Sequence, residues 1–63
     1  MPLPELATTE DFAACARSAM SAAIRELVSA YVFATKGGIA DATCITIDEL
    51  IETARKVRAG MED

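Results

Sequence analysis

The chain contains no histidine, and its 63 residues include only two cysteines and three glycines. Without histidine it lacks the side chain that most often serves as a general acid–base group or a metal ligand. Cys15 and Cys44 lack the spacing of a zinc site and are too few for a disulfide scaffold. The sequence has neither a nucleophile motif nor a glycine-rich phosphate loop. We therefore expect no enzymatic activity, no metal and no cofactor.

Positive charge is also scarce. The chain has six Lys and Arg residues and ten Asp and Glu residues, which gives a net charge of −4. This balance disfavours binding to nucleic-acid phosphates or to an anionic membrane surface. The apolar stretch 12–34 is long enough to span a bilayer, but Arg17, Arg25 and Glu26 interrupt it. The N-terminal "MPLPELATTED" has no basic residue and does not resemble a signal peptide. We expect a cytoplasmic protein with reduced thiols.

Aromatic residues make up only 5% of the chain, although 52% of it is hydrophobic. Much of that apolar content is alanine, which favours helices but buries little surface. Residues 1–63 allow one small domain, whose burial barely exceeds its conformational entropy cost. Since disulfides and metals are not expected, a partner chain is the remaining source of stability.

A long helix is predicted over 9–36. Thr8 or Thr9 suits its N-cap, acidic residues follow in its first turn, and a glycine pair ends it. Residues 1–8 contain two prolines and are expected to form an irregular arm, in which "LPEL" suits a single helical turn.

A loop over 37–45 and a second, shorter helix over 46–60 are predicted next. Thr46 and Glu49 have the spacing of a capping box at its start. Apolar residues at helical spacing form the stripe expected to face the first helix: Ile47, Leu50, Ile51, Ala54 and Val57. The predicted fold is all-α, an antiparallel helical hairpin.

Apolar residues occupy nearly the whole circumference of the first helix. The expected core face consists of Phe12, Ala13, Ala16, Met20, Ala23, Ile24, Leu27, Ala30, Tyr31 and Ala34. Because the second helix is about half as long, we expect it to leave residues 12–23 bare, as an interaction surface. Both cysteines are interpreted as small buried residues, and core packing is favoured for Met20. For Val28, Val32 and Phe33, a binding surface and the intramolecular core are equally favoured.

The candidate protein-binding residues are Phe12, Cys15, Ala16, Ala19, Met20, Ala23, Val28, Val32 and Phe33. They predict a non-catalytic regulator that presents an apolar helical groove to a partner protein. The alternative is a structural protein whose partner is itself, in a homodimeric four-helix bundle. In size, acidity and two-helix build, the chain resembles the small helical antiactivators of bacterial quorum-sensing and conjugative-transfer systems. That resemblance implies sequestration of a transcription activator; it is one of architecture and carries over no site residue.

Overall fold

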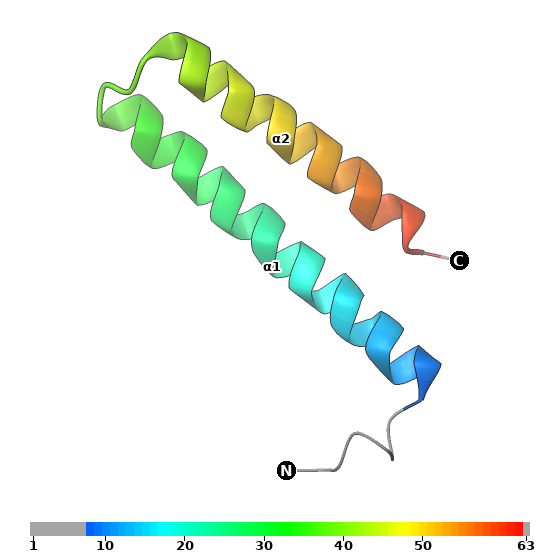
Figure 1. Ribbon diagram of the computed structural model, residues 1–63. Helices are drawn as coiled ribbons and strands as arrows, with labels where there is room; N and C mark the ends of the chain where they lie inside the picture. The colour runs from blue at the N-terminus through cyan, green and yellow to red at the C-terminus, as the bar shows by residue number, and fades with distance from the viewer. Residues whose placement is uncertain (1–7, 63) are drawn as a thin grey trace.

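A computed structural model describes residues 8–62 of the chain. Over these residues it consists of two α-helices, α1 (Thr9–Lys36) and α2 (Asp41–Gly60). The helices run antiparallel and lie side by side (Figure 1). The predicted all-α helical hairpin is confirmed. The predicted N-terminal arm lies outside the described residues, except for Thr8.

A capping box starts α1. Thr8 has an extended backbone, and its side-chain Oγ1 accepts a hydrogen bond from the Asp11 backbone N–H at 3.1 Å. In return, the Asp11 carboxylate accepts one from the Thr8 backbone N–H at 2.9 Å. These bonds satisfy two amides near the helix start that have no partner within the helix. Of the two predicted N-cap residues, Thr8 caps the helix. The helix spans the predicted residues 9–36.

A Schellman motif ends α1 at the glycine pair. Gly38 has a positive φ of 76°, which glycine adopts without the penalty that a Cβ brings. Its N–H donates to the Thr35 carbonyl at 3.4 Å, and the Ile39 N–H donates to the Ala34 carbonyl at 2.9 Å. These two bonds pair the last carbonyls of the helix while the chain reverses direction.

The second helix begins at Asp41, five residues before the predicted start at Thr46. The predicted capping box is wrong, because the Thr46 hydroxyl donates within the helix to the Ala42 carbonyl at 3.0 Å. Burial explains the earlier start. As part of the helix, Cys44 is buried with its Sγ 3.9 Å from the Thr35 hydroxyl near the end of α1. The helix therefore has 20 residues and is about 30 Å long.

The two helices meet along a narrow seam with alternating spacings of three and four residues. Its least exposed positions are Ala13, Arg17, Met20, Ile24, Leu27 and Ala34 in α1, and Cys44, Ile47, Ile51, Ala54, Arg58 and Met61 in and just after α2. Ser21, next to Met20, is also half-buried. This spacing is typical of helices packed as in a coiled coil. Among residues 8–62, only Cys44 and Ile51 have buried side chains.

The seam is narrower than the predicted core. Leu50 and Val57 are 50% and 47% exposed and flank it, so their assignment to the face against the first helix is wrong. The same holds for Phe12, Ala16, Ala23 and Ala30, which are exposed although they were assigned to the core face of the first helix. Tyr31, also assigned to that face, is 36% exposed. A single neighbouring helix covers only the row that points directly at it.

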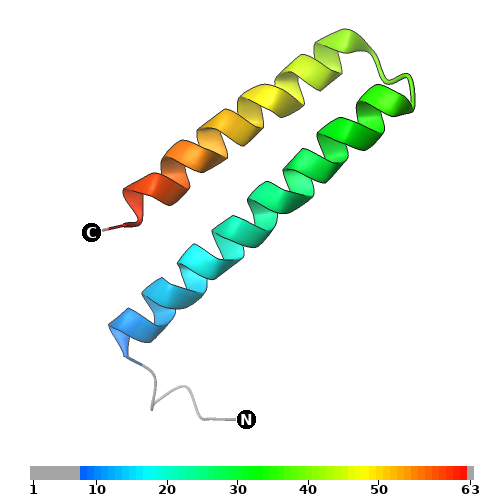
Figure 2. The ribbon, with the colours of Figure 1, turned by 180° about the vertical axis from the view of Figure 1, so that it is seen from behind.

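The uncovered part of α1 is shorter than predicted. The Arg58 Nε, in the last turns of α2, donates to Ser21 Oγ at 3.0 Å. The second helix therefore reaches past the middle of α1, and the expectation that all of 12–23 is bare is wrong. Figure 2 shows only the first turns of α1 extending beyond the end of α2.

The observed cap gives a first prediction. Thr8→Ala should lower the free energy of unfolding by about 1 kcal/mol, because an amide of the first turn loses its acceptor. Thr46→Ala should change it by no more than about 0.7 kcal/mol, toward greater stability, since alanine favours helix interiors. Urea unfolding followed by circular dichroism measures both. A larger loss for Thr46→Ala than for Thr8→Ala would contradict the observed start of α2.

The seam gives a second prediction, with two isoleucines of α2 as a matched pair. Ile51 is 5% exposed and Ile45 is 59% exposed. Ile51→Ala should lower the free energy of unfolding by about 2–5 kcal/mol, through lost burial and a cavity. Ile45→Ala should change it by about 0.5 kcal/mol at most. Thermal unfolding at one fixed chain concentration compares them, and Ile51→Val provides a milder step if Ile51→Ala does not fold. Equal losses for the two alanine variants would disprove the seam.

Candidate protein-binding face

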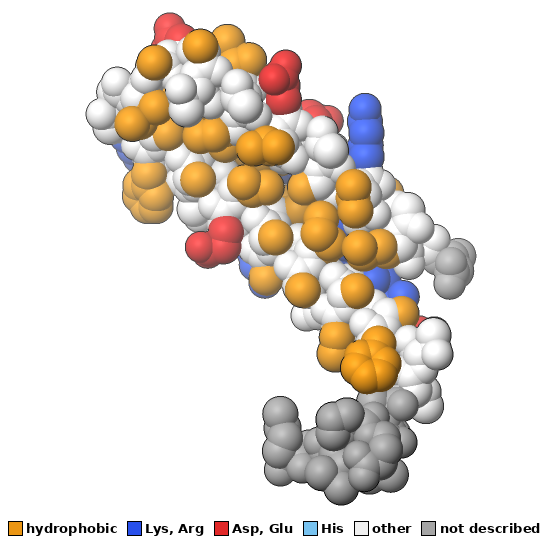
Figure 3. Space-filling model, viewed as in Figure 1, with side chains coloured by type: hydrophobic (Ala, Val, Ile, Leu, Met, Phe, Trp, Pro, Cys, Tyr) orange, Lys and Arg blue, Asp and Glu red, His pale blue; other side chains and the backbone are white. Residues whose placement is uncertain are grey.

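One broad face of the hairpin is apolar over both helices, as the orange side chains in Figure 3 show. We call it the apolar face. It consists of the exposed residues Phe12, Ala16, Ala19, Ala23 and Ala30 of α1 and Leu50 and Val57 of α2. Each row follows the heptad spacing of the seam and lies next to it. Because the helices are right-handed and antiparallel, the two rows flank the seam on the same side.

The charged side chains lie elsewhere. By helical periodicity, those of α1 and α2 project from the seam, the outer edges of the helices or the opposite face of the hairpin. Glu26 is the exception, because it lies seven residues after Ala19 and therefore in the α1 row of the apolar face, toward the outer edge of α1. The described chain measures 48 × 27 × 11 Å, so the hairpin is flat and the apolar face is one of its two broad sides. Large exposed apolar surfaces of this kind mark interaction sites.

The predicted binding residues do not all share this face. Phe12, Ala16, Ala19 and Ala23 lie on it, whereas Met20 is half-buried in the seam.

The remaining predicted residues lie on other parts of α1. Cys15 and Phe33 are exposed on its outer edge, and Val28 and Val32 flank the seam on the side opposite the apolar face. Cys15 was interpreted as buried, and that interpretation is wrong, while Cys44 is buried as expected.

Leu50 and Val57 are the α2 members of the apolar face, and from the sequence they were assigned only to the core. They lie seven residues apart, as do Cys44 and Ile51, so α2 carries two adjacent apolar rows. A single broad stripe at 3.6-residue spacing does not distinguish the rows. The strict alternation of three and four residues that includes Cys44 was the signal that could have separated them.

Near the open end of the hairpin, the hydrogen bond from Arg58 to Ser21 joins the two helices, and two ion pairs lie within single segments of the chain. Besides its bond to Ser21, Arg58 forms an ion pair with Glu62, and Arg17 pairs with Glu10 at 3.0 Å. Both arginines are seam residues whose side chains are partly buried. The hydrogen bond and positive charge of Arg58 lower the pKa of the Glu62 carboxyl.

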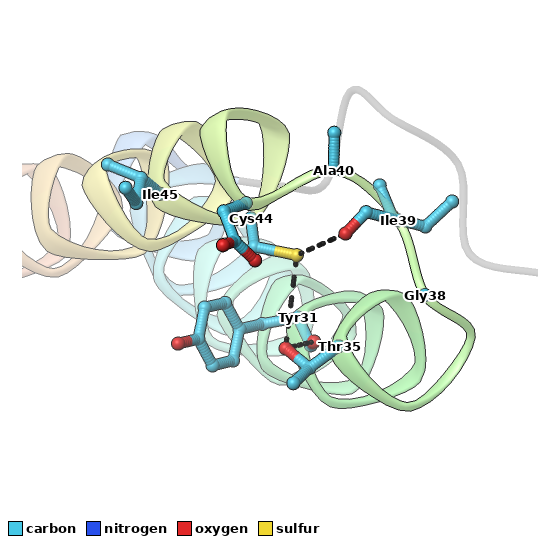
Figure 4. Close-up of a pocket in the computed structure, with 8 residues that line it drawn as sticks. Tyr31, Thr35, Gly38, Ile39, Ala40, Cys44 and Ile45 are labelled. Atoms are coloured by element: carbon cyan, nitrogen blue, oxygen red, sulfur yellow. Dashed lines mark hydrogen bonds between the residues drawn. The ribbon is translucent and has the colours of Figure 1, made fainter.

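A hollow lies at the closed end, beside the loop (Figure 4). Tyr31, Thr35, Ile39 and Cys44 are among the residues that line it. The Thr35 hydroxyl and the Cys44 thiol on its lining are already engaged. The Thr35 hydroxyl donates to the Tyr31 carbonyl at 2.9 Å, and the Cys44 thiol donates to the Ile39 carbonyl at 3.6 Å. Among its lining residues, Asp41 is the one that carries a charge.

Comparison with protein-family models, curated proteins and solved structures gave no significant match. Within residues 8–62, no cluster of three or more His, Cys, Asp or Glu side chains is arranged to hold a metal ion. Neither helix of the described chain is both long and apolar enough to cross a membrane.

The contact between Arg58 and Glu62 gives a prediction about pH. A carboxyl whose pKa is lower in the folded chain stabilises the fold above its unfolded pKa, and loses that effect as the pH falls. The usual value is 4.5. Glu62→Gln should therefore lower the urea midpoint of unfolding at pH 7, and this difference from the wild type should vanish as the pH falls below 4.5. A difference that persisted at low pH would contradict an electrostatic origin.

Proposed function

We propose that this chain is a non-catalytic protein-binding protein, which acts by burying its apolar face against the helices of another protein chain. The observation that carries the proposal is the position of Phe12, Leu50 and Val57. These three large apolar side chains are 59%, 50% and 47% exposed on one flat side of a hairpin. Water contact with so much apolar surface is unfavourable, and burying it supplies the main driving force for association.

The more specific form of this proposal is regulation. A small acidic helical hairpin that covers an apolar surface of a transcription activator would hold that activator inactive, as antiactivators do. The proposal also places the chain in the cytoplasm. Both cysteines are free thiols, as is usual in a reducing compartment.

Site-specific photo-crosslinking tests the use of this face in the native cells. A photoreactive amino acid replaces Ala19 on the apolar face or, as the matched control, Ala14, which is exposed on the opposite side of α1. Irradiation should produce covalent protein adducts of the Ala19 variant, because a bound chain lies against that position, and few or none of the Ala14 variant. Adduct masses are read by denaturing electrophoresis and mass spectrometry.

The outcomes separate clearly. Equal adduct yields from Ala14 and Ala19, or no adducts from either, would overturn the proposed function. Adducts specific to Ala19 support it, whatever the mass of the attached chain, and that mass distinguishes a second copy of this chain from a different protein.

A further inference from the structure

We propose that the chain that covers the apolar face is a second copy of this hairpin, docked face to face about a two-fold axis parallel to the helices. In this arrangement each α1 lies against α2 of the other copy, and both loops lie at the same end of a four-helix bundle. The inference rests on the proposed function and names its partner.

The first argument is the size of the side chains. On the apolar face α1 presents four alanines and, near its start, Phe12, whereas α2 presents Leu50 and Val57. Helices pack well where large side chains of one fit beside small side chains of the other. Placing α1 over α2 of the other copy achieves this. Placing α1 over α1 and α2 over α2 sets alanine against alanine and large residues against each other.

The second argument is the level of these residues along the hairpin. The bond between Arg58 and Ser21 fixes the antiparallel register of the two helices. Counting from it, Val57 lies level with Ala22 and Ala23, and Leu50 lies level with Ser29 and Ala30. A two-fold axis parallel to the helices preserves these levels. Leu50 and Val57 of one copy therefore lie opposite Ala30 and Ala23 of the other, the small residues that leave room for them.

The third argument is charge. Two copies of a chain with a net charge of −4 repel one another, so a self-docking face must keep its acidic groups apart. Glu26 is the one charged residue in the two rows of the apolar face. Because the two-fold axis sets each α1 against α2 of the other copy, the two Glu26 side chains lie over different helices and do not face one another. The opposite face and the outer edges carry other acidic residues of the two helices. Docking through those surfaces would bring like charges together.

The fourth argument is area. The broad side of the hairpin measures 48 Å by 27 Å. A stable interface buries about 800 Å² on each partner, and a side of these dimensions has room for one. A hairpin in which only Cys44 and Ile51 are buried among residues 8–62 also gains much from a second layer. Docking turns the exposed rows of both copies into a shared core, as small helical domains commonly require.

Sedimentation equilibrium of the purified full chain tests the partner. The wild type should be a dimer, and Ala23→Glu should raise the dimer dissociation constant at least tenfold, because a charge would be buried without a counter-ion. Ala14→Glu makes the same change on the opposite side of α1 and should leave the constant unchanged. Leu50→Ala should also weaken the dimer, and it serves as the test if Ala23→Glu does not fold. It replaces a half-exposed residue by a strong helix former.

The separation of the loops tests the orientation. Ala40→Cys, made together with Cys15→Ser and Cys44→Ala, allows one spin label per chain beside the loop. Pulsed electron resonance should give a distance below about 20 Å between labels at one end of the bundle. Loops at opposite ends of the bundle would lie roughly 40 Å apart, the length of α1. That larger distance would overturn the orientation.

A wild type that stays monomeric over the whole accessible concentration range would overturn the second copy as partner. The proposed function would still stand if Ala19 then formed adducts with a different protein in cells. A dimer unaffected by both Ala23→Glu and Leu50→Ala would show that the copies associate through another surface, and would overturn the inference.

Discussion

Each helix of a two-helix hairpin has only one neighbour, and this limit governs the whole structure. One neighbour covers one row of side chains, here the row at alternating spacings of three and four residues. Everything outside that row stays in contact with water, including Leu50 and Phe12. The apolar face is therefore the direct result of placing two broad apolar stripes on a fold that can bury only a narrow one.

Much of the fold could be predicted from local chemistry. Thr8, the acidic first turn and the glycine pair bound α1, because caps and turns depend on a few neighbouring residues. The start of α2 could not be found in this way. Thr46 and Glu49 imitate a capping box, and the competing contribution, burial of Cys44 against the end of α1, exists only once the hairpin is formed.

Only part of the candidate site could be predicted, because its exposure also depends on how the two helices pack. Ala16, Ala19 and Ala23 were assigned to a binding surface because apolar residues surround α1, and they do lie on the apolar face. The reason expected for their exposure, that the second helix is too short to cover them, was wrong. They are exposed because they flank the seam, and Leu50 and Val57 are exposed for the same reason. Which of two neighbouring apolar rows turns inward depends on a small rotation of the helix that periodicity alone does not determine.

The connection at Gly38 bears on the order in which the molecule forms. The contact between Thr35 and Cys44 encloses nine residues of chain separation, and the contact between Ser21 and Arg58 encloses 37. Closing a longer loop costs more entropy, so contacts near the turn form first and each one shortens the loop that the next must close. The contacts between the helices thus form in order from the turn toward the free ends of the hairpin. Its kinetics are governed by short-range contacts, which allow fast folding.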